Sequence, residues 1–98
     1  MPNFRNEATD KLFKAILNLE SVEDCYNFFE DICTIKELQD MTQRLEVALL
    51  LDEGVNYQGI SQKVNVSTAT ISRVSRCLHY GSGGYKKAID ILKSEEAK

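Results

Sequence analysis

The stretch YQGISQKVNVSTATISRV, residues 57–74, has the pattern of two short helices joined by a tight turn. Ser61 is small enough for the point where the two helices would pass closest. Asn65 tolerates the left-handed backbone conformation that such a turn requires, and Ser67 is a typical N-cap for the second helix. Apolar residues occur where the helices would contact each other, at Ile60, Val64, Val66, Ile71 and Val74. The stretch therefore predicts a helix-turn-helix.

The second helix of this motif has short polar and basic side chains at the positions that the apolar contacts leave free. Hydroxyl, methyl and guanidinium groups suit the edges of bases and the phosphates of DNA. We expect Thr68 and Thr70 to contact bases, and Arg73 and Arg76 mainly to contact phosphates. The expected DNA-binding residues are Lys63, Ser67, Thr68, Ala69, Thr70, Ser72, Arg73 and Arg76.

The distribution of charge along the chain agrees with this interpretation. Residues 1–53 contain five Lys or Arg against twelve Asp or Glu, a balance of −7, whereas residues 54–98 contain seven against three, a balance of +4. No Asp or Glu occurs in residues 54–89. A polyanion would be attracted to the second half and repelled by the first. Charge alone does not decide between DNA contacts and ordinary solvated side chains.

Three further helices are expected before the motif, each beginning at a residue that can cap a helix. The residues concerned are Asn6, Ser21 and Thr34, with Asp24 and Glu37 three residues after the last two. The third of these helices should end at Gly54, because glycine readily adopts the left-handed conformation that ends helices. No segment shows the alternation of a β-strand, so the fold is predicted to be all α, with about six helices.

Apolar side chains point to partnership with a second subunit. Residues 47–51, VALLL, are apolar on nearly every side of the third helix, and such a helix must be covered all round. A chain of 98 residues buries a limited share of its surface by itself. We therefore expect a homodimer of a single domain, residues 1–98. Its dimerisation helices would lie in residues 1–53, its reading head in residues 57–79 and its C-terminal helix in residues 84–95.

Several classes of protein are excluded. The three cysteines are an odd number without C-x-x-C spacing, so we expect small buried thiols and no disulfide framework or metal site. Neither paired carboxylates nor a Ser/His/Asp arrangement suggests an enzyme, and no cofactor is expected. The longest apolar run is far below the roughly 20 residues that span a bilayer. We therefore expect a cytoplasmic protein without membrane contact.

Two other functions use the same helices. A DNA-bound adaptor module could serve replication or polymerase recruitment with the same reading head, although the chain has no nucleotide-binding loop. A purely structural interaction protein would use the two helices for packing only, with Arg73 and Arg76 as solvated charges. Such a protein would not require so long an acid-free stretch, and we therefore favour a sequence-specific transcription regulator, a repressor.

The motif and its surroundings resemble the Trp repressor superfamily, and within it the Trp-repressor-related YerC/YecD group of bacterial proteins. The resemblance rests on ATISRVSRCL, residues 69–78, and on a long preceding helix that begins with TIKE, residues 34–37, and ends with LLLDEG, residues 49–54. It covers nearly the whole chain. It implies an all-helical, intertwined homodimer whose two reading heads enter successive major grooves of double-stranded DNA.

The same resemblance implies a candidate ligand pocket formed by Arg44, Thr70 and Arg73. In that family two arginines enclose the indole of tryptophan, and a threonine lies nearby. Arg73 and Thr70 match directly, and Arg44 matches if one residue is inserted near Gly54. The family has glycine where this chain has Val74, whose side chain would occupy the space of the indole. The resemblance therefore does not favour tryptophan as a corepressor here, and Arg44 could instead pair locally.

Overall fold

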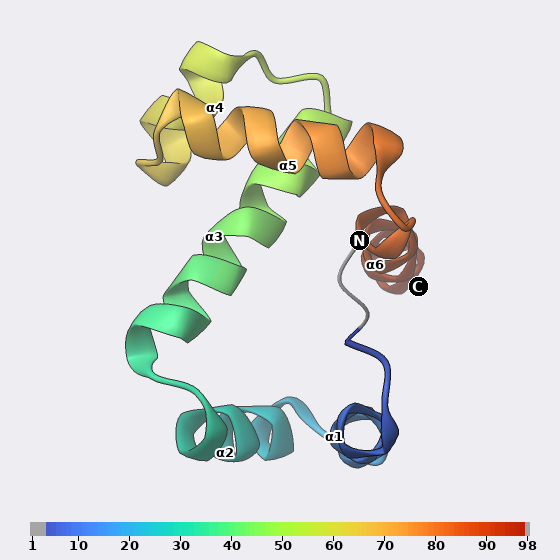
Figure 1. Cartoon of the computed structure of the whole chain (residues 1–98). Coiled ribbons are helices and arrows are strands. Elements are labelled where there is room, and N and C mark those ends of the chain that lie inside the picture. Colours follow the sequence, from blue (N-terminus) through green and yellow to red (C-terminus); the bar gives the residue numbers. More distant parts are fainter. Residues whose placement is uncertain (1–3, 98) are drawn as a thin grey trace. The chain divides into compact units, whose positions relative to one another are not determined.

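The computed structural model of the chain describes residues 4–97, and every regular element in this range is an α-helix (Figure 1). The prediction of an all-α fold with six helices is confirmed for these residues. The helices are α1 (Glu7–Leu17), α2 (Val22–Ile32), α3 (Ile35–Asp52), α4 (Tyr57–Val64), α5 (Thr68–Tyr80) and α6 (Gly84–Glu96). None of them is both long enough and apolar enough to cross a membrane.

The chain forms two compact units whose boundary lies inside α3. The N-terminal unit ends at Leu38 and contains α1, α2 and the first turn of α3. The C-terminal unit begins at Gln39 and contains the rest of α3 together with α4, α5 and α6.

The three expected N-caps of the first half of the chain are confirmed. The Asn6 side chain accepts a hydrogen bond from the Thr9 backbone N–H at 2.9 Å. Ser21 Oγ accepts one from the Asp24 N–H at 3.0 Å. The Asp24 carboxylate in turn accepts from the N–H of Glu20, one residue before the cap, at 3.1 Å.

Thr34 and Glu37 form the complete capping box at the start of α3. Thr34 Oγ1 accepts from the Glu37 N–H at 3.1 Å, and Glu37 Oε1 accepts from the Thr34 N–H at 2.8 Å. Two helix-terminal donors are thereby satisfied by one pair of side chains. The hydrogen bonds from Thr34 lower the pKa of the Glu37 carboxyl below its ordinary value.

The N-terminal unit leaves its apolar side chains largely exposed. Neither α1 nor α2 contains a buried residue. Leu17 is 81% exposed and Ile35 is 78% exposed. The aromatic rings of Phe28 and Phe29 contact each other edge to face, with centroids 5.5 Å apart, but both remain half-buried. This unit therefore has apolar surface in excess of what it covers itself.

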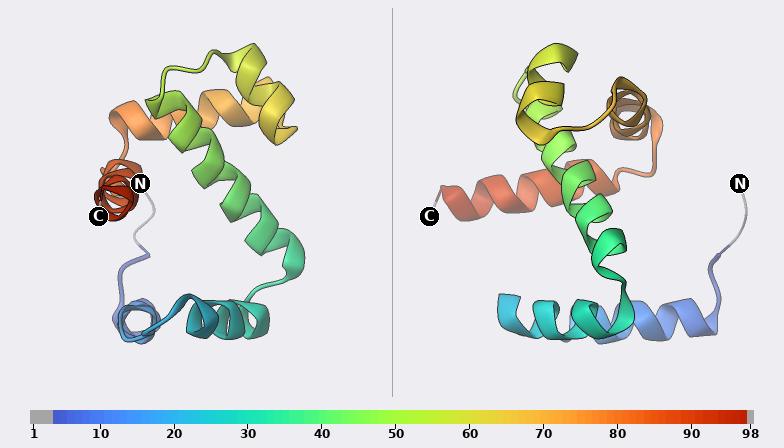
Figure 2. Two further views of the ribbon diagram at one scale, coloured as in Figure 1. Left: turned by 180° about the vertical axis from the view of Figure 1, so that it is seen from behind. Right: turned by 90° about the vertical axis from the view of Figure 1, so that its left-hand side faces the viewer.

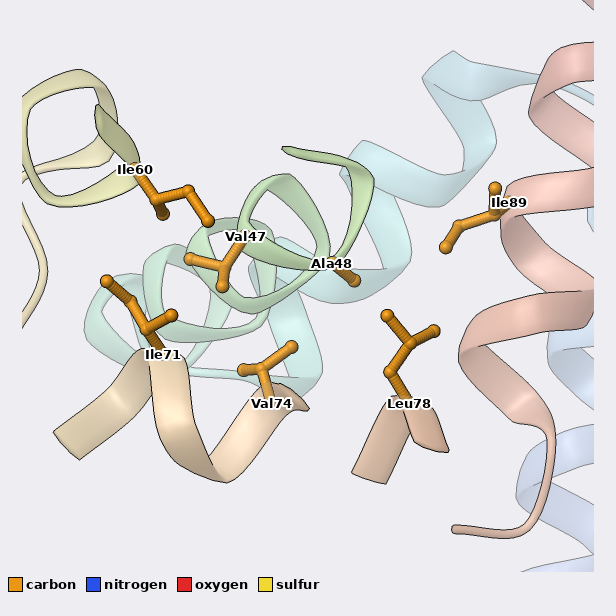
Figure 3. Packing of buried hydrophobic residues seen from close by; sticks show 7 residues of the cluster. All are labelled: Val47, Ala48, Ile60, Ile71, Val74, Leu78 and Ile89. Atoms are coloured by element: carbon orange, nitrogen blue, oxygen red, sulfur yellow. The ribbon is translucent and has the colours of Figure 1, made fainter. Parts of the chain in front are cut away.

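The C-terminal unit has a true hydrophobic core, to which α3, α4, α5 and α6 all contribute (Figure 3). In both views of Figure 2, α4 and α5 lie at the C-terminal end of α3. The buried residues are Val47, Ala48, Ile60, Ile71, Val74, Leu78 and Ile89.

The expectation that residues 47–51 need a second subunit to cover them is wrong for Val47 and Ala48. Val47 and Ala48 are fully buried inside the single chain, because α4 and α5 cover that side of α3. Leu49, Leu50 and Leu51 are only half-buried, and each packs partly against the same core.

Two glycines set the ends of helices in the C-terminal unit. Gly54 has φ +85° and ends α3 as expected. The Gly54 N–H donates to the Leu51 carbonyl and the Val55 N–H to the Leu50 carbonyl, both at 3.0 Å, which is the Schellman pattern. Gly83, with φ +86°, precedes α6. α5 ends at Tyr80 and α6 at Glu96, so each helix is one residue longer at its C-terminal end than expected.

Candidate nucleic-acid interface

The turn between α4 and α5 has the predicted geometry. Asn65 adopts φ 58° and ψ 52°, the left-handed conformation, and its N–H donates to the Ser61 carbonyl at 3.0 Å. The Ser61 hydroxyl crosses the turn and donates to the Val66 carbonyl at 2.9 Å. Ser61 therefore does more than leave room, because its hydroxyl also ties the end of α4 to the chain that enters α5.

Each helix of the motif has a side-chain N-cap. Ser67 Oγ accepts from the Thr70 N–H at 3.2 Å, as predicted for α5. The cap of α4 is Asn56, which accepts from the Gly59 N–H at 2.8 Å and was missed in the sequence. A Cβ at Gly59 would lie 3.0 Å from Val55 Cγ1 and 3.2 Å from Asn56 Oδ1, so this glycine lets the cap approach closely. The asparagine immediately before the helix was the available signal.

α5 separates its core side chains from its polar ones. Ile71, Val74 and Leu78 are buried on one face of the helix. All the expected DNA-binding residues are exposed except Thr70, which is half-buried and bonded to the Ser67 cap. The exposed set, on α4, the turn and α5, is Lys63, Ser67, Thr68, Ala69, Ser72, Arg73 and Arg76.

A small cavity of about 240 Å³ lies beside α5 in the C-terminal unit. It is lined by all three residues of the candidate ligand pocket and by three others, so that the complete lining is Arg44, Thr70, Arg73, Val74, Cys77 and Tyr85. No acidic residue belongs to this lining. Val74 is 2% exposed and belongs to the hydrophobic core, so its side chain forms both core and cavity wall.

Tyr85 is the cavity residue that sequence reasoning missed. It lies in the first turn of α6, is half-buried, and packs against the core cluster. Burial raises the pKa of its phenol above the ordinary value, and Cys77 adds to this effect, while the charges of Arg44 and Arg73 act in the opposite direction. The phenol is therefore neutral near neutral pH. No local motif marks the residue, which reaches the cavity only through the packing of α6.

The expectation of buried thiols is wrong. Cys77 is exposed, and Cys25 and Cys33 are only half-buried. Cys77 directly precedes the buried Leu78 in α5 but is itself exposed. Its position in the wall of the cavity accounts for its exposure.

The family model described as Trp repressor protein matches residues 7–93. The chain belongs to the Trp repressor family.

Relatives of this Trp repressor family member agree over nearly its whole length. The uncharacterized protein YerC of Bacillus subtilis (strain 168) is 50% identical over 94 residues, which are 96% of this chain and 90% of that protein. The crystal structure of a TrpR like protein from Eubacterium eligens ATCC 27750 is 46% identical and superimposes with a TM-score of 0.88, covering 91% of this chain and 92% of that one. A crystal structure from Staphylococcus aureus, 47% identical, gives a TM-score of 0.87 over 91% of this chain and 89% of that one.

Proposed function

We propose that this Trp repressor family member is a sequence-specific, DNA-binding transcription regulator, a repressor, that acts as a homodimer. In this proposal α5 is the recognition helix and enters the major groove of double-stranded DNA. The observation that supports it best is the exposed surface of the helix-turn-helix, which presents hydroxyl, methyl and guanidinium groups and no acidic side chain.

The structure of α5 fits this role because one face of the helix packs in the core while the opposite face is exposed. Ile71 and Val74 anchor the helix in the core. Thr68 and Ala69, at its exposed N-terminal end, are short enough to let the backbone approach base edges closely. Arg73, Arg76 and Lys63 are long and charged, and in this proposal they contact phosphates on either side of the groove.

The distribution of charge along the chain also favours the helix-turn-helix as the surface that faces DNA. The acid-free residues 54–89 include all of α4 and α5, whereas twelve of the fifteen acids of the chain lie in residues 1–53. DNA would be attracted to the helix-turn-helix and repelled by the first half of the chain. Residues 57–79 are therefore proposed as the reading head, and residues 84–95 as the C-terminal helix.

The homodimer is proposed from surface that the single chain leaves uncovered. The N-terminal unit exposes apolar side chains such as Leu17 and Ile35, and residues 1–53 are proposed to form the dimerisation helices. In the C-terminal unit, a groove of about 620 Å³ between α3 and α6 has apolar walls of leucines and a charged rim of four glutamates and Lys93. The leucines of this groove are Leu45, Leu49, Leu50 and Leu92.

The apolar and positively charged side chains of a second copy of the chain complement this groove. Helix α1 combines exposed apolar residues, Phe13 and Leu17, with the cations Lys11 and Lys14, which could pair with the acids of the groove rim in the other subunit. A two-fold dimer of reading heads would bind a pseudo-palindromic site with half-sites about 10 bp apart.

Selection from a random pool of double-stranded DNA tests the proposed function. The purified protein is incubated with the pool, and the bound DNA is amplified and sequenced over several rounds. We expect enrichment of one pseudo-palindromic sequence whose half-sites lie roughly one helical turn apart. A protein lacking Arg73 and Arg76, as the double alanine variant, serves as the matched control and should enrich nothing. Absence of any enriched sequence with the wild-type protein would contradict the proposal.

A further inference from the structure

We propose that Tyr85 is a positioning residue, whose ring braces the recognition helix α5 against α3 and so keeps it ordered for DNA without a bound ligand. The DNA part of this inference rests on the proposed function. The brace itself is a property of the C-terminal unit and is testable in the absence of DNA.

Three helices meet around the cavity beside α5, and each supplies part of its wall. Arg44 comes from α3, Tyr85 comes from α6, and the remaining four lining residues come from α5. Tyr85 is the one aromatic residue in this lining. Because it also packs against the core cluster, a single side chain links the core to the side of α5 that presents Arg73.

The helix that supplies Tyr85 is itself tied to α3. Ile89 of α6 is 2% exposed and belongs to the shared core. One turn further along, Lys93 Nζ of α6 lies 2.5 Å from Asp52 Oδ2, at the end of α3. The middle of α6 is therefore held in the core to which α3 and α5 both contribute, its last turn is tied to α3, and Tyr85 in its first turn reaches the cavity beside α5. This arrangement makes α6 a link between α3 and α5.

α5 needs such a link because its own sequence holds it weakly. Thr68, Thr70, Ile71 and Val74 are β-branched and disfavour a helix relative to alanine or leucine. The two guanidiniums that line the cavity repel each other, and no carboxylate in the lining compensates them. An aromatic ring supplies a large contact area with few rotatable bonds, which suits a brace at this position.

The electrostatic surroundings of the phenol agree with this placement. Burial raises the pKa of Tyr85, and both Arg44 and Arg73 are near enough to lower it. The two arginines therefore act on the same ring from α3 and from α5. A neutral ring in the wall that they share adds no further charge to the cavity.

Three variants test the brace: Tyr85→Ala removes the ring, Tyr85→Phe keeps it without the hydroxyl, and Tyr80→Ala removes a ring that is 87% exposed in the last residue of α5, just outside the proposed reading head of residues 57–79. Fluorescence anisotropy with the selected DNA measures each Kd. If Tyr85→Ala lowers the ordered fraction of α5 to about a tenth, its apparent Kd rises about tenfold. Tyr85→Phe and Tyr80→Ala should bind as the wild type does.

Chemical rescue separates a brace from general loss of stability. p-Cresol has the ring and hydroxyl that Tyr85→Ala lacks, so a saturating concentration should restore the DNA affinity of this variant and leave Tyr80→Ala unchanged. If circular dichroism shows that Tyr85→Ala does not fold, Tyr85→Leu takes its place, because leucine keeps apolar packing but lacks the ring. Tyr85→Leu is expected to weaken DNA binding in the same direction.

Amide hydrogen exchange without DNA is the second readout. Residues 68–80 should exchange faster in Tyr85→Ala than in the wild type, at the wild-type rate in Tyr85→Phe, and more slowly again when p-cresol is added. The proposal would be overturned if Tyr85→Ala exchanged its amides and bound DNA as the wild type does. It would also be overturned if Tyr85→Ala lost DNA affinity and p-cresol did not restore it. A wild-type protein that binds no DNA would overturn the proposed function, while the exchange data would still decide the role of Tyr85.

Discussion

At the scale of single residues, Thr68 and Arg76 are both exposed on α5 but should affect DNA binding differently. Thr68→Ala removes a hydroxyl near the N-terminal end of the recognition helix, so we expect it to change sequence preference. Arg76→Ala removes a phosphate contact, so it should weaken all sequences alike and lower the salt slope by about 1. Anisotropy titrations at several salt concentrations measure both effects.

Lys36→Ala is the matched control for these titrations, since it also removes an exposed charge but lies in the first turn of α3, outside the reading head and outside the groove contacts proposed between subunits. It should leave the salt slope unchanged. If Thr68→Ala and Arg76→Ala both bind every sequence as the wild type does, α4 and α5 form a packing hairpin and not a reading head.

The position of the Val74 side chain leads us to expect that free tryptophan is not a corepressor of this protein. Its side chain is buried and lines the cavity that Arg44, Thr70 and Arg73 also line. Overpacking a formed site costs about 1 to 3 kcal/mol, which weakens a ligand by roughly 5- to 150-fold. Titration calorimetry with L-tryptophan should therefore show no micromolar binding, and DNA affinity should not depend on the amino acid.

Val74→Gly tests the physical reason for this expectation. If the valine closes the cavity, the glycine variant should bind tryptophan more tightly than the wild type, and Val74→Ile should not. Micromolar binding by the wild type that also tightens DNA association would refute the expectation.

At the scale of elements, the capping box of α3 predicts a pH-dependent contribution to stability. The folded pKa of Glu37 is lowered by its hydrogen bonds with Thr34, so the carboxylate stabilises the helix at pH values above its unfolded pKa. This contribution is lost as the pH falls through the lowered folded pKa. Thermal unfolding between about pH 7 and about pH 3 should show a larger loss for the wild type than for Glu37→Gln, which cannot titrate. Parallel pH profiles of the two proteins would show that the box does not contribute in this way.

The helix-turn-helix is expected to be the least stable part of the C-terminal unit. Its residues are poor helix formers, whereas α3 is long and combines a capping box with the buried Val47 and Ala48. Amide exchange should therefore be faster in residues 57–78 than in residues 34–51. Equal protection of the two ranges would show that packing fully offsets the weak local propensity.

At the scale of the whole molecule, exposed apolar surface predicts an obligate homodimer. Sedimentation over a broad concentration range should show dimers, with unfolding as the dimer dissociates. Leu17→Lys, at a position 81% exposed in the single chain, should shift the equilibrium toward the monomer because it places a charge in the apolar surface of α1. Asn27→Lys, at an exposed polar position of α2, is the control and should remain dimeric. A folded wild-type monomer that persists at micromolar concentration would overturn the entwined dimer.

The sequence alone was sufficient for the helices and for the turn of the motif. The caps at Asn6, Ser21, Thr34 and Ser67 act on backbone groups within three residues, and the positive φ of Asn65 follows from its position in a tight turn. Such features depend on neighbours along the chain, and a single sequence displays them directly. The family, too, could be identified from residues that are contiguous in the motif and in the preceding helix.

Only the tertiary structure decided what covers each helix face. The spacing showed that residues 47–51 are apolar on nearly every side of α3, but not that α4 and α5 of the same chain bury Val47 and Ala48. Spacing likewise showed neither the exposure of Cys77 nor the place of Tyr85 in the cavity wall. The periodicity of a helix determines which side chains share a face, whereas the helix that packs against that face depends on contacts between residues far apart in sequence.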